Sequence, residues 1–134
     1  MNPIRLIFAA ITAFIFIFAF EFVYHGIFLK PQYEETMALW RTPEQMMLLM
    51  PIATTVQFGF AFLLSVIFAT FAPQGGAKQG LRFGALAGLM IGLLQLGAYV
   101  YLPIPLELAS AWFAGYFFET LGAGMIIGAI YKKA

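Results

Sequence analysis

The chain contains no cysteine and only one histidine, His25, among its 134 residues. Without cysteine it forms no disulfide, no thiolate metal site and no cysteine nucleophile. One histidine excludes bis-histidine haem ligation within a single chain. The phosphate-binding motif GxxxxGK[ST] and the hydrolase motifs GxSxG and HExxH are also missing. No catalytic residue is therefore predicted.

Charged residues are scarce, at 10% of the chain, and the formal net charge is +1. This charge gives no basic field for nucleic acid and no acidic tail, so no nucleic-acid partner is expected. Hydrophobic residues make up 63% of the chain, more than a soluble domain of this length can bury. The lipid bilayer is the expected surrounding. Long unbroken apolar runs favour helices over the alternating strands of a barrel.

Four apolar segments reach the length of about 20 residues that a membrane-spanning helix needs. We predict an all-α, integral membrane four-helix bundle, a single transmembrane domain over residues 1–134 with helices at 4–29, 43–71, 80–102 and 106–131. The first segment is too long for the apolar region of a signal peptide, which favours a spanning helix. The connection at 103–105 is so short that the last two helices must be antiparallel neighbours.

The segment between the first two helices has a character of its own. Tyr33, Met37 and Trp40 share one face of a possible short helix, which predicts a segment lying on the membrane surface. A lid over a substrate is the alternative. The second helix should begin with a capping box at Thr42, and Pro51 should kink it.

The positions of lysine and arginine predict the orientation in the membrane. One side of the membrane carries two of them, Lys30 and Arg41. The side that holds both termini carries five: Arg5, Lys78, Arg82, Lys132 and Lys133. Because basic residues favour the cytoplasmic side, we predict a multi-pass protein with both termini in the cytoplasm.

Glycines recur at every fourth position on the last two helices. Gly84, Gly88 and Gly92 lie on one face of the third helix, and Gly124 and Gly128 form one such step on the fourth. Small residues at this spacing let two helix backbones approach closely in lipid. We interpret these glycines as helix-packing faces within the bundle. A homodimer seam and a flexible gating surface are the alternatives.

Polar residues interrupt every predicted helix. They are Glu21 and His25 on the first, Gln57 on the second, Gln95 on the third and Glu119 on the fourth. A rise of about 1.5 Å per residue puts them in the outer half of the membrane or near its midplane, with His25 closest to the surface. A carboxylate facing hydrocarbon costs at least a few kcal/mol, so Glu21 and Glu119 should face the bundle interior.

Two interpretations of these polar residues stay open. They are candidates for binding a small molecule, an ion or a proton, or they are polar contacts that hold the helices together. Glu21, His25 and Glu119 form too weak a pattern to predict a metal site. No cofactor is identified.

The end of the first helix is rich in aromatic residues at 22–30 and is followed by Trp40 and by the glycine-rich later helices. In these features most of the chain resembles small bacterial four-helix inner-membrane proteins of unknown function. The resemblance implies the bacterial inner (cytoplasmic) membrane. It carries over no activity and no functional residue.

The sequence leaves three functions open. The first is an accessory or structural subunit, acting in a larger membrane complex or as a homo-oligomer. The second is binding or transport of a small molecule, an ion or a proton through the intramembrane polar residues. The third is an enzyme acting on a lipid-soluble substrate.

Overall fold

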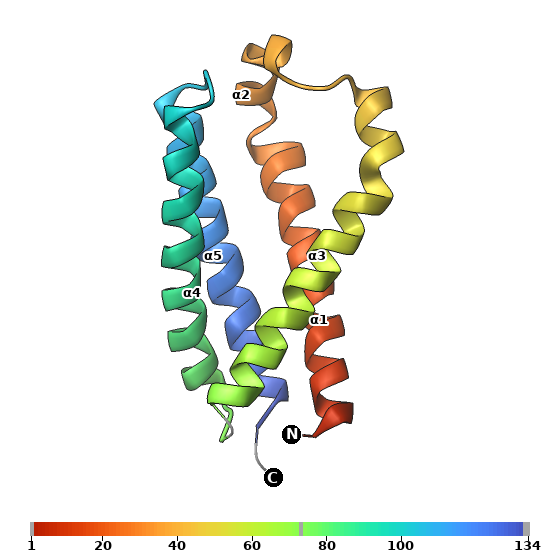
Figure 1. Ribbon diagram of the computed structural model, residues 1–134, viewed down its shortest axis with the longest axis vertical. Helices are drawn as coiled ribbons and strands as arrows, with labels where there is room; N and C mark the ends of the chain where they lie inside the picture. The colour runs from red at the N-terminus through yellow and green to blue at the C-terminus, as the bar shows by residue number, and fades with distance from the viewer. Residues whose placement is uncertain (1, 73, 133–134) are drawn as a thin grey trace.

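Four long helices run side by side in the computed structural model, which describes residues 2–72 and 74–132 (Figure 1). They are α1 (Pro3–Val23), α3 (Pro43–Phe71), α4 (Ala77–Gly97) and α5 (Leu106–Ile130). The π-helical turn η1 (Tyr24–Phe28) continues α1, and the 3-10 turn η3 (Ala98–Val100) continues α4. All four are long and apolar enough to cross a membrane. The predicted all-α four-helix fold is confirmed, and the protein is a multi-pass membrane protein.

A short helical segment joins α1 to α3 at the end of the bundle opposite both termini (Figure 1). It consists of α2 (Lys30–Glu35) and the 3-10 turn η2 (Met37–Leu39), and it confirms the predicted interfacial segment. The shared face of Tyr33, Met37 and Trp40 is not kept, because Met37 is 72% exposed while Tyr33 and Trp40 are half-buried. The change to 3-10 geometry after Thr36 alters the helical spacing at this point.

Local sequence explains where the helices begin. Thr42 and Gln45 form the predicted capping box at the start of α3, with each side chain accepting from the other residue's backbone N–H. Helix α4 begins at Ala77, three residues before the predicted Gly80. Gly75 and Gly76 end the preceding loop with φ angles of 66° and 102°, a left-handed region that suits glycine. The backbone N–H of Gly76 then donates to the carbonyl of Gly128 on α5 at 2.7 Å.

Helices α4 and α5 lie backbone against backbone along their glycines. Gly80, Gly84, Gly88 and Gly92 are all buried on α4. A Cβ atom added at Gly84 would lie 2.5 Å from the Thr120 carbonyl oxygen, and one added at Gly124 would lie 2.5 Å from the Gly80 carbonyl oxygen. No side chain larger than hydrogen fits at these positions without moving the helices apart. Glycine therefore sets the distance between α4 and α5.

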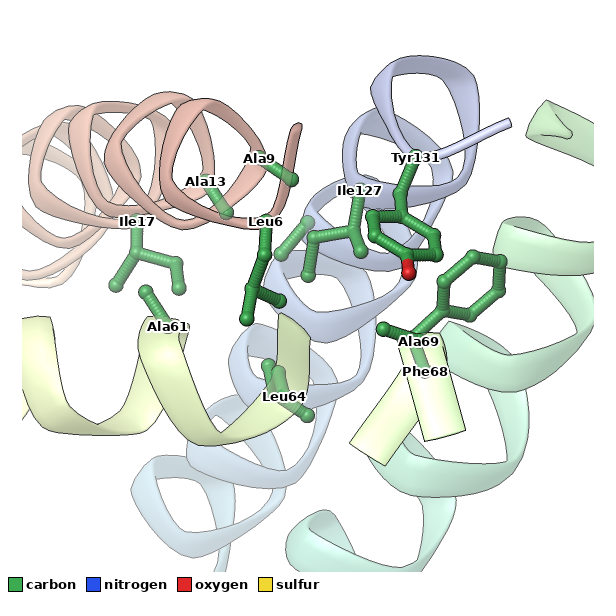
Figure 2. Packing of buried hydrophobic residues seen from close by; sticks show 11 residues of the cluster. Leu6, Ala9, Ala13, Ile17, Ala61, Leu64, Phe68, Ala69, Ile127 and Tyr131 are labelled. Carbon is green, nitrogen blue, oxygen red and sulfur yellow. The ribbon is translucent and has the colours of Figure 1, made fainter. Parts of the chain in front are cut away.

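The main hydrophobic core lies among α1, α3 and α5 at the end that holds the termini. Figure 2 shows Ile17 of α1 above Ala61 of α3, with Ile127 and Tyr131 of α5 to one side. The two ends of the chain are joined here, because the backbone N–H of Asn2 donates to the Tyr131 hydroxyl at 3.1 Å and the Arg5 guanidinium donates to the Lys132 carbonyl. A smaller core at the opposite end contains Leu29, Ile104, Leu108 and Ala109.

Helix α3 packs on the rest of the chain through only part of its length. Its buried residues begin at Ala61, and residues 43–53 are all exposed. Figure 1 shows this N-terminal half, which contains Pro51, turned away from α1. Proline removes one backbone hydrogen bond of the helix and crowds the preceding turn. The space beside the upper part of α1 is therefore not covered by α3.

Candidate functional site

A pair of carboxyl groups lies inside the membrane-spanning part of the bundle. Glu119, near the middle of α5, is only 2% exposed. Its carboxyl group lies close to that of Glu21 on α1. Two ionised carboxylates repel each other strongly at close range away from water, so the pair favours a proton on at least one of the two groups. The two glutamates therefore form a site that holds a proton between α1 and α5.

His25 extends this pair towards the end of the bundle where α2 lies. Its Nε2 atom is 3.7 Å from a carboxyl oxygen of Glu21, one helical turn earlier. Its Nδ1 atom is 2.6 Å from the Tyr33 hydroxyl on α2. The histidine ring thus lies between an acid inside the membrane and a hydroxyl in the interfacial segment.

The hydrogen bonds of Tyr33 favour one of the two neutral forms of His25. The indole N–H of Trp112 on α5 donates to the Tyr33 hydroxyl oxygen at 2.7 Å. Burial raises the pKa of Tyr33 to about 12, so the hydroxyl keeps its own proton, and while it accepts from Trp112 that proton is free to be donated to His25 Nδ1. A neutral His25 then carries its proton on Nε2, the nitrogen that faces Glu21. Hydrogen bonding therefore turns the ring towards the acid.

The local backbone around His25 is not a regular α-helix. In η1 the backbone N–H of Leu29 donates to the Tyr24 carbonyl at 2.8 Å, five residues back. A π-helical turn inserts one extra residue and shifts the side chains that follow, and such turns are frequent at functional sites. Gly26 lies within this turn. The turn ends at Leu29, which is fully buried in the core near α2 and anchors the end of the helix.

Aromatic rings surround the polar chain on the side of α2. Tyr33 contacts the His25 ring face at a centroid distance of 5.9 Å and the Trp40 ring edge-on at 5.6 Å. Trp40 in turn lies 6.0 Å from Trp112. The Trp40 indole N–H donates to the Thr36 hydroxyl at 2.8 Å, which fixes its orientation. Both tryptophans of the chain therefore belong to this cluster.

The structure brings together only some of the residues singled out from the sequence. Glu21, His25 and Glu119 lie in one connected group. Gln57 on α3 and Gln95 on α4 are half-buried, and among the described residues no hydrogen bond joins either of them to this group. The packing glycines lie between α4 and α5, outside the polar group: Gly84, Gly88, Gly92, Gly124 and Gly128.

Three members of the site did not emerge from the sequence. The sequence places Tyr33 only on one face of the interfacial segment, and no motif in it singles out Trp112. Tyr116, one turn from Glu119 on α5, lies within electrostatic range of both Glu21 and Glu119. A Trp or Tyr placed one or two turns from an intramembrane acid would have been the signal for Trp112 and Tyr116, since both rings combine an apolar body with a polar group.

The described residues contain no group of three His, Cys, Asp or Glu side chains arranged to hold a metal ion. Two acids, one histidine and one tyrosine in series instead form an arrangement that can hold and pass a proton. The fold and this group define a small multi-pass membrane protein with an intramembrane dicarboxyl site. Comparison with family models, curated proteins and solved structures found no match for the chain.

Proposed function

We propose that the protein binds and transfers protons within a bacterial inner membrane, as a small ion- or proton-handling transport protein. The carrying observation is the close pair of Glu119, which is buried, and Glu21, which His25 links to Tyr33 on α2. A buried ionisable group is costly in a bilayer, and a connected series of them is the usual chemistry of a proton relay. Protons enter from the α2 side at Tyr33 and His25, and Glu21 and Glu119 hold them inside the bundle.

The orientation that we propose places both termini in the cytoplasm. Arg5 and Lys132 are joined at the end that holds the termini, and Lys78 and Arg82 begin the helix α4 at the same end (Figure 1). Lys133, which belongs to the same predicted group, lies outside the described residues. Basic residues near the ends of spanning helices favour the cytoplasmic side. The end of the bundle that carries α2 then faces away from the cytoplasm.

Proton flux into liposomes tests the function directly. The purified protein is reconstituted with a pH-sensitive dye inside the vesicles, and a potassium gradient with valinomycin drives protons across the membrane. We expect flux well above that of protein-free vesicles. Glu119→Gln keeps the shape of a protonated carboxyl but cannot release a proton, so it should slow the flux at least tenfold.

Glu107→Gln is the matched control, because Glu107 lies in the first turn of the same helix and its side chain is exposed. It should transport like the wild type. Thermal unfolding in detergent must show that both variants fold. Flux from the wild type no faster than from empty vesicles, or equal flux from folded Glu119→Gln, would contradict the proposal.

A second candidate, an accessory subunit of a membrane complex, is supported by the N-terminal half of α3. This half makes little contact within the chain, and its large exposed apolar side chains are Met46, Met47, Leu48, Leu49, Met50, Ile52, Val56 and Phe58. Small residues and apolar faces of this kind are where helices associate in lipid. Purification from native membranes in mild detergent separates the two candidates, since an accessory subunit elutes in a stoichiometric larger complex and shows no flux alone.

A further inference from the structure

The end of the bundle that holds the termini carries basic side chains and no acidic ones. Its described basic residues come from α1, from α4 and from the segment after α5: Arg5, Lys78, Arg82 and Lys132. The six acidic residues of the chain all lie near the middle of the bundle or towards α2: Glu21, Glu34, Glu35, Glu44, Glu107 and Glu119. The ion pairs among the described residues lie on that side as well: His25 with Glu21, and Lys30 with Glu34. The sequence therefore supplies no acidic side chain for the basic end, and an anion from outside the chain can pair with it.

A small cavity lies at this basic end, between the last residues of α3 and the first turns of α4. Its volume is about 300 Å³, and it is lined by Phe71, Ala72, Gln74, Gln79 and Arg82. Sites for small molecules have volumes of about 300–1,000 Å³, so this cavity is large enough for a compact polar group and too small for a whole lipid. All of its lining residues except Ala72 are exposed, so it opens to the surroundings of the bundle.

The end of α5 holds the loop that forms one wall of the cavity. The backbone N–H of Gly76 donates to the Gly128 carbonyl at 2.7 Å. Gly75 lies so close to the chain end that an added Cβ would be 2.5 Å from the Lys132 Cα. Gln74, which lines the cavity, directly precedes these two glycines. The same contact therefore fixes this wall and brings the backbone of a second basic residue, Lys132, beside the loop.

Arg82 lies at the depth where lipid phosphate groups are found. It belongs to the spanning helix Ala77–Val100, and a rise of about 1.5 Å per residue places it about 8 Å from the first residue of that helix. An arginine near the end of a spanning helix keeps its aliphatic part among apolar groups and extends its guanidinium to the membrane–water interface. The paired N–H donors of a guanidinium match the oxygens of a phosphate group. Arg82 is therefore suited to bind a phosphate at the membrane surface.

The other lining residues indicate which kind of phosphate compound fits. Phe71 is the last residue of α3 and is 82% exposed, so an acyl chain in the bilayer can lie against its ring. The amide groups of Gln74 and Gln79 can donate to headgroup oxygens. A zwitterionic headgroup would bring an ammonium group to an end of the bundle that has no acidic side chain, whereas basic pockets between spanning helices suit anionic headgroups. We propose that the cavity binds an anionic phospholipid, with the phosphate on Arg82 and an acyl chain along Phe71.

Phosphatidylglycerol is the probe for the test, and phosphatidylcholine with the same acyl chains is its zwitterionic counterpart. The full chain is purified in detergent and freed of lipid, and native mass spectrometry then counts the lipid molecules bound to each protein as either lipid is added. We expect one phosphatidylglycerol to bind saturably and about tenfold more tightly than phosphatidylcholine. Arg82→Gln removes the phosphate ligand from an exposed position, so it should weaken phosphatidylglycerol binding about tenfold, to the level of phosphatidylcholine.

Lys78→Gln is the matched control, because it removes the same charge one turn away on the same helix, from a residue that does not line the cavity. It should leave the affinity for phosphatidylglycerol nearly unchanged. Equal losses in Arg82→Gln and Lys78→Gln would mean a diffuse attraction to the basic end and would overturn the proposal. Equal binding of the two lipids to the wild type would overturn it without any variant. A soluble anion is the competing occupant: displacement of the lipid by millimolar inorganic phosphate would assign the cavity to that anion instead.

Discussion

Replacing Gly84 by alanine tests the close packing of α4 on α5. The added Cβ would lie 2.5 Å from the Thr120 carbonyl oxygen and 2.9 Å from the Leu121 Cα. Both neighbours are backbone atoms, so neither can rotate away. Real Cβ atoms almost never approach closer than 3.0 Å, and the helices must separate here by at least 0.5 Å, the difference between 3.0 and 2.5 Å.

A gap of this size weakens contacts along the whole interface. A separation of about 0.5–1 Å loses a quarter to a half of the attraction between each pair of atoms. Overpacking of a well-packed contact costs about 1–3 kcal/mol. We expect Gly84→Ala to lose stability in this range, measured by thermal unfolding in detergent micelles followed by circular dichroism.

Gly97→Ala is the matched control on the same helix, because no atom lies within 4 Å of the position its Cβ would take. Alanine favours a helix over glycine by up to about 1 kcal/mol, so this variant should be as stable as the wild type or slightly more stable. Equal melting temperatures for Gly84→Ala and Gly97→Ala would refute the claim that the glycines set the distance between α4 and α5.

Three further predictions concern the remaining elements. Tyr33→Phe removes the hydroxyl that Trp112 and His25 share, so it should cost about 1–3 kcal/mol in thermal unfolding and shift tryptophan emission, while Tyr99→Phe on the exposed end of α4 should do neither. A membrane-impermeant thiol reagent on intact cells should label Glu34→Cys but not Gln74→Cys, and the reverse pattern would contradict cytoplasmic termini. Thr42→Ala removes one half of the capping box and should speed hydrogen exchange over the first turn of α3, with about 0.5–2 kcal/mol of local stability lost; unchanged exchange there would contradict the role of the cap.

The helices could be predicted from the sequence because each depends on local features. Short stretches of the sequence contain all the signals that are needed. These are the apolar runs of spanning length, the capping box at Thr42 and the prolines on either side of Ile104. The start of α4 was missed because it depends on a bond between distant residues, from the Gly76 N–H to the Gly128 carbonyl. Because of the left-handed turn at Gly75 and Gly76, the helix begins at Ala77, whereas the apolar pattern predicts a start at Gly80.

The candidate site could be predicted only where one helix fixed the geometry. The spacing of Glu21 and His25 puts them on one face, and the cost of exposing Glu119 to lipid turns it inward. No spacing rule places Tyr33, since its position depends on how α2 folds back over the end of α1. Gln57 shares a level with Glu21, but the divergence of α3 keeps a hydrogen bond from forming among the described residues.

The site joins a tightly packed part of the bundle to a loosely packed one. Glu119 lies on α5, which glycine contacts hold firmly against α4. Glu21 and His25 lie at the end of α1 and in η1, beyond the core contact of Ile17 with Ala61. This end of the helix is held by the Tyr33 hydroxyl, by the buried Leu29 and by the bond from the Tyr24 hydroxyl to the Ala111 carbonyl. Regions with few packed contacts move most readily. A small shift of the α1 end would therefore increase the distance between the Glu21 and Glu119 carboxyl groups while α5 stays in place. In the proposed relay, proton transfer between the two glutamates would then depend on how α2 holds the end of α1.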